Sequence, residues 1–346
     1  MHQQRKKSSY FLVLGYCIKK LCENKIEKGD FAVQTPHIIY NDKKPSTTAL
    51  IAKRLAAKNA DFMRHKTIEE HRETQNFIFS KLAVPKNIST QHVFCSNVKC
   101  EWIWQTDCEL SSRVVLYLHG GSWAFGSLKT ARAAGIKMAE ALRCRVLTVD
   151  YRLSPENPFP AGLSDTYSVY IWLLKSGFKP SDIGLLGDSA GGNLALCLTT
   201  KLIQKEQPLP ACIALISPAT DLRTECAALS AKPDLLYTLH RGLDTDVFSM
   251  YVPKGIDRSN PLISPICGSL AGFPPILIHA GSDECLTEDI IAFANKAHSD
   301  NVDILLKLWV DLFHNFTLGS PIFPEAQESV VELADFLCSH LQMNTK

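Results

Sequence analysis

From about residue 113 onward, the chain alternates between short apolar runs and helical patterns. A continuous apolar run such as Arg113–Leu118 is typical of a strand buried on both faces. Strands that alternate with helices pair in parallel, so the pattern predicts an α/β protein with a mostly parallel, doubly wound sheet. The expected strands span residues 91–98, 100–104, 113–118, 145–149, 183–186, 212–216, 275–279 and 302–309, and the expected helices span residues 131–142, 165–174, 193–203, 287–298 and 325–341.

Two stretches depart from this alternation. Residues 1–90 contain an amino-terminal extension and, over residues 47–79, a charged segment with the pattern of two helices. Residues 221–262 are rich in charges and prolines and interrupt the succession of core strands. We therefore expect a core at residues 91–346, covered by a helical cap formed from residues 1–90 and from an insertion at residues 221–262.

Composition excludes several classes of protein. Thirty-seven Lys and Arg residues face thirty-five Asp and Glu residues, so the net charge of +2 provides no field that would attract nucleic acid. The twelve cysteines include no C-x-x-C pair, which argues against a zinc ribbon or a thioredoxin-like motif. We expect reduced thiols, a cytoplasmic location and no bound metal.

The amino terminus combines a basic start with an apolar run from Tyr10 to Ile18, which Lys19 and Lys20 end. This run is too short to span a bilayer and lacks an A-x-A cleavage pattern. Its helical spacing and flanking lysines would allow a basic amphipathic helix to contact a membrane surface. The expectation that we favour is a helix packed on its own protein.

The sharpest local motif is the G-x-S-x-G segment Gly187–Gly191, which follows one predicted strand and precedes a predicted helix. This context suits a nucleophile elbow, a tight turn that lifts the hydroxyl of Ser189 above the sheet. Glycine-rich turns of this kind also bind phosphate. Here the P-loop and dinucleotide-binding patterns are absent and Asp188 would repel an anion, so we favour the nucleophile.

A serine nucleophile needs a base and an orienting carboxylate. In α/β-hydrolases these follow the serine in the order acid, then histidine, on loops after later strands. The strand predicted at residues 275–279 leads to Asp283, and the strand predicted at residues 302–309 leads to His314. The sequence thus predicts a triad of Ser189, Asp283 and His314.

The strand at residues 113–118 ends in His119-Gly120-Gly121-Ser122. The segment is similar to the HGGG loop of lipases and esterases, with Ser122 in place of the last glycine. Backbone N–H groups in such a loop stabilise the oxyanion of an acyl-transfer intermediate. We expect the donors to be Gly120, Gly121 and Ala190, and His119 to hold the loop.

Together these motifs resemble the hormone-sensitive-lipase family of α/β-hydrolases. The resemblance also rests on Val149–Glu156, Phe159-Pro160-Ala161 and Gly281–Glu284, and it extends from about Pro85 to the carboxyl end. It implies a serine carboxylesterase for esters of small to medium acyl chain, without an organic or metal cofactor. Glu284, Glu288 and Asp289 lie close to the predicted acid in the sequence, so a neighbouring carboxylate could also fill this position. The family pattern favours Asp283.

Four aromatic residues could line the substrate pocket, or equally well pack the cap: Trp123, Phe125, Phe248 and Tyr251. The same triad would serve a hydrolase of lactones or amides, or a lipase. A non-catalytic ligand-binding protein on this fold is a remote alternative, because no triad member is missing. The partner that we expect is a small-molecule ester; the sequence does not determine the oligomeric state.

Overall fold

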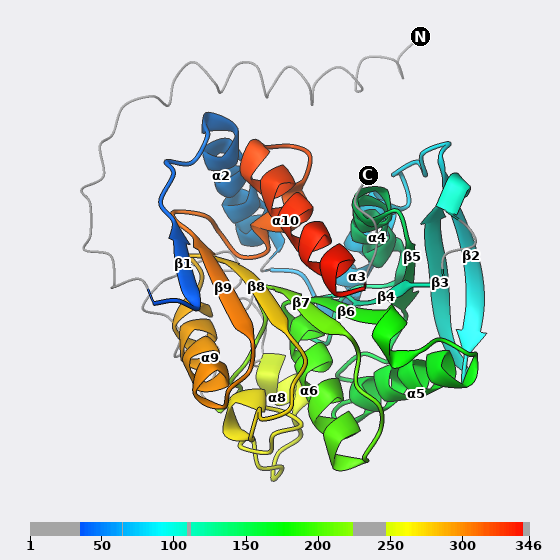
Figure 1. The fold of residues 1–346 in the computed structure, drawn as a ribbon. Coiled ribbons are helices and arrows are strands. Elements are labelled where there is room, and N and C mark those ends of the chain that lie inside the picture. The colour runs from blue at the N-terminus through cyan, green and yellow to red at the C-terminus, as the bar shows by residue number, and fades with distance from the viewer. Residues whose placement is uncertain (1–34, 64, 109–111, 224–246, 342–346) are drawn as a thin grey trace. The chain divides into compact units, whose positions relative to one another are not determined.

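The computed structural model describes residues 35–63, 65–108, 112–223 and 247–341. Within these residues, nine strands form one sheet in the order β1-β9-β8-β7-β6-β4-β5-β3-β2 (Figure 1). The strands are β1 (Ile38–Asn41), β2 (Ile88–Cys95), β3 (Val98–Gln105), β4 (Val114–Leu118), β5 (Arg145–Val149), β6 (Ile183–Asp188), β7 (Cys212–Ile216), β8 (Ile276–Gly281) and β9 (Ile304–Trp309). All neighbouring pairs are parallel except β2–β3 and β3–β5. The predicted α/β fold with a mostly parallel sheet is therefore confirmed.

Helices cover both faces of the sheet. One face packs against α4 (Leu128–Leu142) and α10 (Pro324–His340), and the other packs against α5 (Ala161–Lys175), α6 (Ala190–Gln204) and α9 (Thr287–Ser299) (Figure 1). Helix α6 is buried along most of its length, because it lies between the sheet and the loops that follow β7. None of the helices in the described residues is long and apolar enough to cross a bilayer.

The structure differs from the sequence prediction at the antiparallel edge. The predicted strands at residues 91–98 and 100–104 are displaced, because the turn that joins β2 and β3 falls at Ser96 and Asn97. Both residues have positive φ angles, 49° and 69°, as a two-residue hairpin turn requires. At the other edge, the four-residue strand β1 was not predicted; it is defined by its parallel pairing with β9.

A buried ion pair ties α4 to β3. Glu101 is 1% exposed, and its carboxylate accepts hydrogen bonds from Arg132 Nε at 2.9 Å and from Arg132 Nη2 at 2.7 Å. This two-point contact pairs a buried charge with a guanidinium. The exposed ring of His92 also approaches the carboxylate, with Nε2 3.3 Å from Glu101 Oε1.

We expect Arg132→Met to lower the free energy of unfolding by about 3 to 5 kcal/mol, because the buried Glu101 carboxylate loses its guanidinium partner and keeps only a single contact with the exposed ring of His92. Urea denaturation measures this loss. The matched double variant Arg132→Met/Glu101→Leu removes both charges and should recover most of the stability. A single variant that loses less than about 1 kcal/mol would contradict the assignment.

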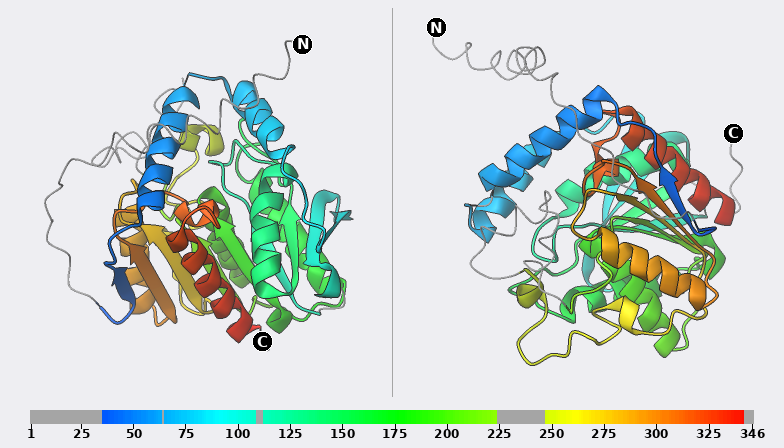
Figure 2. Two further views of the ribbon diagram at one scale, coloured as in Figure 1. Left: turned by 90° about the horizontal axis from the view of Figure 1, so that it is seen from above. Right: turned by 90° about the vertical axis from the view of Figure 1, so that its left-hand side faces the viewer.

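Two helices near the amino end, α2 (Thr47–Met63) and α3 (Ile68–Phe79), lie at the carboxyl end of the strands (Figure 2). We call them the cap helices. Lys53 of α2 donates to the carbonyl of Asp311, after β9, at 2.8 Å. Arg72 of α3 donates to the carbonyls of Ala124 and Ser154, after β4 and β5, at 2.8 and 2.7 Å. Each cap helix is thus tied to loops that follow core strands.

Part of the predicted cap cannot be compared with the structure. The predicted amino-terminal helix and most of the insertion at residues 221–262 lie outside the described residues. The described end of that insertion contains α8 (Val247–Tyr251), which is largely buried.

Candidate active site

The predicted nucleophile lies at a strained turn between β6 and α6. Ser189 has φ 52° and ψ −118°, a conformation that a residue with a Cβ adopts only under constraint. The Ser189 amide donates to the carbonyl of Ile216 at 2.9 Å, and the Ser189 carbonyl accepts from the amide of Ala219 at 3.2 Å. These two bonds to the end of β7 and the loop after it hold the turn. The hydroxyl does not cap α6.

The predicted base reaches this hydroxyl from the loop after β9. His314 Nε2 lies 3.0 Å from Ser189 Oγ, and His314 Nδ1 lies 2.9 Å from Glu284 Oε2. His314 is 6% exposed, and the side chain of Glu284 is fully buried. Because an ionised carboxylate only accepts hydrogen bonds, this arrangement assigns the Nδ1 proton to the bond with Glu284 and leaves Nε2 to accept the hydroxyl proton.

Glu284 is held in place by two further donors. Its Oε1 accepts from Ser217 Oγ at 2.7 Å and from the Gly281 amide at 2.5 Å. The same Ser217 oxygen accepts from the amide of Asn315 at 3.1 Å, next to the histidine. Ser217 therefore connects the loop that carries the acid with the loop that carries the base.

The structure replaces Asp283 with Glu284 as the acid beside His314. The carboxylate of Asp283 points to the cap instead, where it accepts a hydrogen bond from Lys53 Nζ, and its side chain is 46% exposed. The Asp283 amide donates to the carbonyl of Leu312 at 3.0 Å, which sets the path of the loop. On this path, adjacent residues project to different sides, so only Glu284 faces the histidine.

The loop after β4, His119–Ser122, which we call the oxyanion loop, also departs from the prediction. The amide of Gly120 donates to Asp188 Oδ1 at 2.9 Å, so Gly120 is not available as a donor to substrate in this conformation. The amide of Gly121 donates no hydrogen bond to another described residue, and Ala190 is the first residue of α6. Helix amino termini present uncapped N–H groups and a partial positive charge. Gly121 and Ala190 therefore remain as candidate donors.

His119 holds the loop, as expected. Its ring stacks on Tyr151 with centroids 4.4 Å apart, and its Nδ1 lies 2.7 Å from the carbonyl of Gly120. Burial lowers the pKa of His119, which favours the neutral imidazole with Nδ1 as the donor. The Tyr151 hydroxyl donates to the His119 carbonyl at 2.7 Å. Hydrogen bonds therefore hold two successive carbonyls of the loop, those of His119 and Gly120.

Comparisons with known proteins agree with this fold. Residues 115–318 match a family model described as the alpha/beta hydrolase fold. A solved esterase of the bacterial hormone-sensitive lipase family superposes with a TM-score of 0.74 at 31% identity and covers 83% of this chain and 98% of its own. The chain belongs to the hormone-sensitive-lipase family of α/β-hydrolases.

Other relatives of this hydrolase are named for similar activities. An esterase of Acinetobacter venetianus is 35% identical over 66% of this chain and 76% of its own length. An acetyl-hydrolase of Streptomyces hygroscopicus is 34% identical over 69% of this chain and 79% of its own length. A solved esterase/lipase from an uncultured bacterium is 29% identical, with a TM-score of 0.75, over 86% of this chain and 99% of its own.

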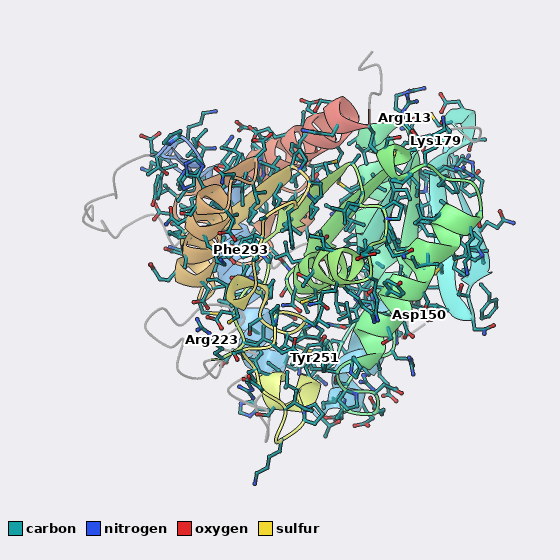
Figure 3. The ribbon with its side chains drawn as sticks, turned by 60° about the horizontal axis from the view of Figure 1, so that its bottom comes forward. Arg113, Asp150, Lys179, Arg223, Tyr251 and Phe293 are labelled. Atoms are coloured by element: carbon teal, nitrogen blue, oxygen red, sulfur yellow. The ribbon has the colours of Figure 1, made fainter. Side chains whose placement is uncertain are left out.

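The four aromatic residues predicted near the pocket are all buried in this hydrolase. Trp123 stacks on Tyr251 at 4.5 Å between centroids, and Phe248 meets the Trp123 ring edge-on at 5.9 Å. Phe125 packs instead against His71 of α3, at 4.9 Å. Figure 3 shows Tyr251 at the end of the molecule away from Arg113, which precedes β4. The aromatic residues thus join the oxyanion loop to α8 and to a cap helix.

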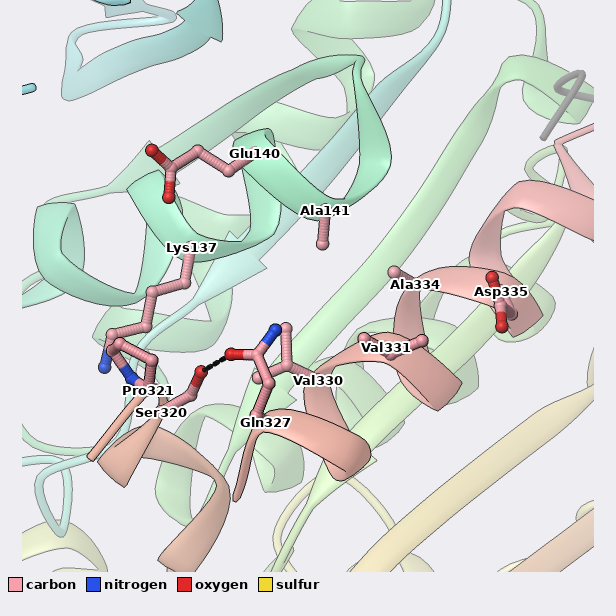
Figure 4. A pocket seen from close by; sticks show the side chains of 10 residues that line it. All are labelled: Lys137, Glu140, Ala141, Ser320, Pro321, Gln327, Val330, Val331, Ala334 and Asp335. Atoms are coloured by element: carbon pink, nitrogen blue, oxygen red, sulfur yellow. Dashed lines mark hydrogen bonds between the residues drawn. The ribbon is translucent and has the colours of Figure 1, made fainter. Parts of the chain in front are cut away.

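A surface pocket of this hydrolase lies away from the triad. Its volume is about 280 Å³, and it lies between α4 and α10 (Figure 4). Lys137 and the hydrogen-bonded pair Ser320 and Gln327 line part of it, and none of its lining residues belongs to the elbow, the oxyanion loop or the triad. We assign it no role in the reaction.

Two side chains of the candidate site are not predicted from the sequence. Glu284 was considered only as a neighbour of Asp283, and nothing in the local sequence separates two adjacent carboxylates. Ser217 was not considered, although its position at the end of β7 placed it at the same edge of the sheet as the triad. A search for hydroxyl residues just after each core strand would have found it.

Proposed function

We propose that the protein is a serine carboxylesterase whose catalytic triad is Ser189, His314 and Glu284. The observation that carries the proposal is the continuous hydrogen-bonded relay of hydroxyl, imidazole and buried carboxylate at 3.0 and 2.9 Å, which starts at a strained elbow. Relatives that are named esterase and acetyl-hydrolase support ester substrates.

The reaction follows from the positions of these groups. His314 Nε2 takes the hydroxyl proton as Ser189 Oγ attacks the ester carbonyl. The amides of Gly121 and Ala190 stabilise the negative charge on the carbonyl oxygen. The imidazolium, oriented by Glu284, then protonates the leaving alcohol. A water molecule that is deprotonated by the same imidazole releases the acid and restores the serine.

We further propose that the preferred acyl chains are small to medium. The acetyl-hydrolase relative supports this range. Lactones, amides and long-chain lipid esters would use the same relay, so a lactone and an amide are assayed beside an ester series that extends to long chains.

The test is the release of p-nitrophenol from esters of increasing acyl length by the full chain, together with covalent labelling. We expect fastest turnover with short chains. We also expect an alkyl phosphonate ester to stop turnover and add its mass to the peptide that contains Ser189. The Ser189→Ala variant is the control and should neither turn over substrate nor gain mass. A folded protein that turns over no ester, lactone or amide would refute the proposal.

A further inference from the structure

Asp188 precedes the nucleophile, and the proposed reaction does not use it. Asp188 is 3% exposed, and its carboxylate accepts three hydrogen bonds from two separate segments, β4 with the loop after it and the loop after β9. Tyr117 Oη of β4 donates to Oδ1 at 2.6 Å, and the Gly120 amide donates to the same oxygen at 2.9 Å. Asn315 Nδ2 donates to Oδ2 at 3.0 Å.

Two of these donors are neighbours of groups that take part in the proposed reaction. Gly120 immediately precedes the candidate oxyanion donor Gly121. Asn315 immediately follows the base and has a φ of 58°, so its peptide helps to shape the turn that carries the imidazole. Asp188 itself is part of the elbow. One carboxylate therefore joins the oxyanion loop, the elbow and the base loop.

The contact between Asp188 and the oxyanion loop is close. A Cβ added to Gly120 would lie 2.3 Å from Asp188 Oδ2 and 2.9 Å from the Asp188 carbonyl. Glycine is therefore required at this position for the backbone to approach the carboxylate. The peptide of Gly120 is held between Asp188 on one side and the ring of His119 on the other.

Burial and hydrogen bonding have opposite effects on the Asp188 carboxylate. Burial raises the pKa of Asp188, and the bonds from Tyr117 and Gly120 only partly offset this rise. Without the carboxylate, a buried amide and a buried phenol would lose their acceptor, which is costly in a dry site. The hydrogen bond to Asp188 therefore stabilises the observed position of the loop.

We propose that Asp188 is a positioning residue of the reaction. By holding the Gly120 amide, it orients the Gly120–Gly121 peptide so that the Gly121 amide faces the carbonyl oxygen of the ester, and it steadies the turn that carries His314. The inference rests on the proposed esterase function. Asp188 does not touch substrate, so it acts on the stabilisation of the transition state and not on the binding of the ester. Its loss should lower kcat and leave KM nearly unchanged.

Steady-state kinetics with p-nitrophenyl butyrate on Asp188→Ala and Asp188→Asn tests this. We expect Asp188→Ala to lower kcat about 10²-fold with KM changed by less than about threefold, as for the loss of an oxyanion donor. Asp188→Asn should recover part of kcat, because its amide oxygen still accepts from Gly120 and the Asn315 amide can rotate to accept from the new NH₂ group. The affinity of an alkyl boronic acid, which forms a tetrahedral adduct with the serine, should fall in parallel with kcat/KM.

Tyr117→Phe is the matched control. It removes a donor to the same carboxylate oxygen but leaves the bonds to Gly120 and Asn315, so its kcat should fall less than that of Asp188→Ala. The proposal is overturned if Asp188→Asn and Asp188→Ala retain kcat within about twofold, or if KM alone changes. If Asp188→Ala does not fold, the kcat and boronic acid affinity of Asp188→Asn decide. An inactive wild type would instead refute the esterase function.

Discussion

Replacing Glu284 with alanine should lower kcat by about 10³- to 10⁴-fold, whereas replacing the adjacent Asp283 should change kcat by less than about threefold. The reason is the relay: Glu284 fixes the tautomer and the orientation of His314 and stabilises the imidazolium that forms during attack. Asp283 makes only a partly exposed ion pair with Lys53, and such pairs contribute little to stability.

The two variants form a matched pair, since they remove adjacent carboxylates from one loop. Both should be assayed with p-nitrophenyl butyrate after circular dichroism and thermal unfolding have shown that they are folded. Glu284→Gln adds a finer test, because it keeps the size of the side chain but loses the negative charge that stabilises the imidazolium. A larger loss of kcat in Asp283→Ala than in Glu284→Ala would contradict the assignment of the acid.

Gly191→Ala should abolish turnover and strongly destabilise the fold. A Cβ at this position would lie 2.0 Å from the carbonyl of Leu118 and 2.5 Å from that of His119, which are backbone atoms at the start of the oxyanion loop. Neither can move without separating β4 from α6. We expect a loss of several kcal/mol in the free energy of unfolding, in the range of severe packing or backbone defects.

Gly177→Ala is the matched control for this experiment. Its φ of 93° is unfavourable for alanine, but a Cβ there would meet no atom within 4 Å. It should therefore cost only about 1 kcal/mol, from backbone strain alone, and leave kcat unchanged. Thermal unfolding and ester turnover are measured for both variants. The comparison distinguishes the steric requirement at Gly191 from the conformational requirement at Gly177. Equal effects of both substitutions would contradict the steric argument.

Much of the fold was readable from local patterns. The run Val114–Leu118 and residues 183–186 are apolar, each precedes a helical pattern, and both lie in central parallel strands, β4 and β6. Prediction from local patterns failed where the pairing between strands determines the position of a strand or a turn. The turn at Ser96 and Asn97 is set by the register of β2 against β3, and β1 is too short to be recognised without the neighbouring strand β9.

Sequence alone determined the order of the candidate site residues along the chain: a serine in a strand-turn-helix segment, then a carboxylate and a histidine after later strands. These signals are local, because each depends on the few residues around one strand end. Tertiary structure alone decided between Glu284 and Asp283, and directed the Gly120 amide to Asp188 instead of to substrate. Both choices depend on the direction in which a side chain or an amide points, and that direction is set by packing against segments far away in the sequence, such as the cap helix that carries Lys53 and the strand that carries Tyr117.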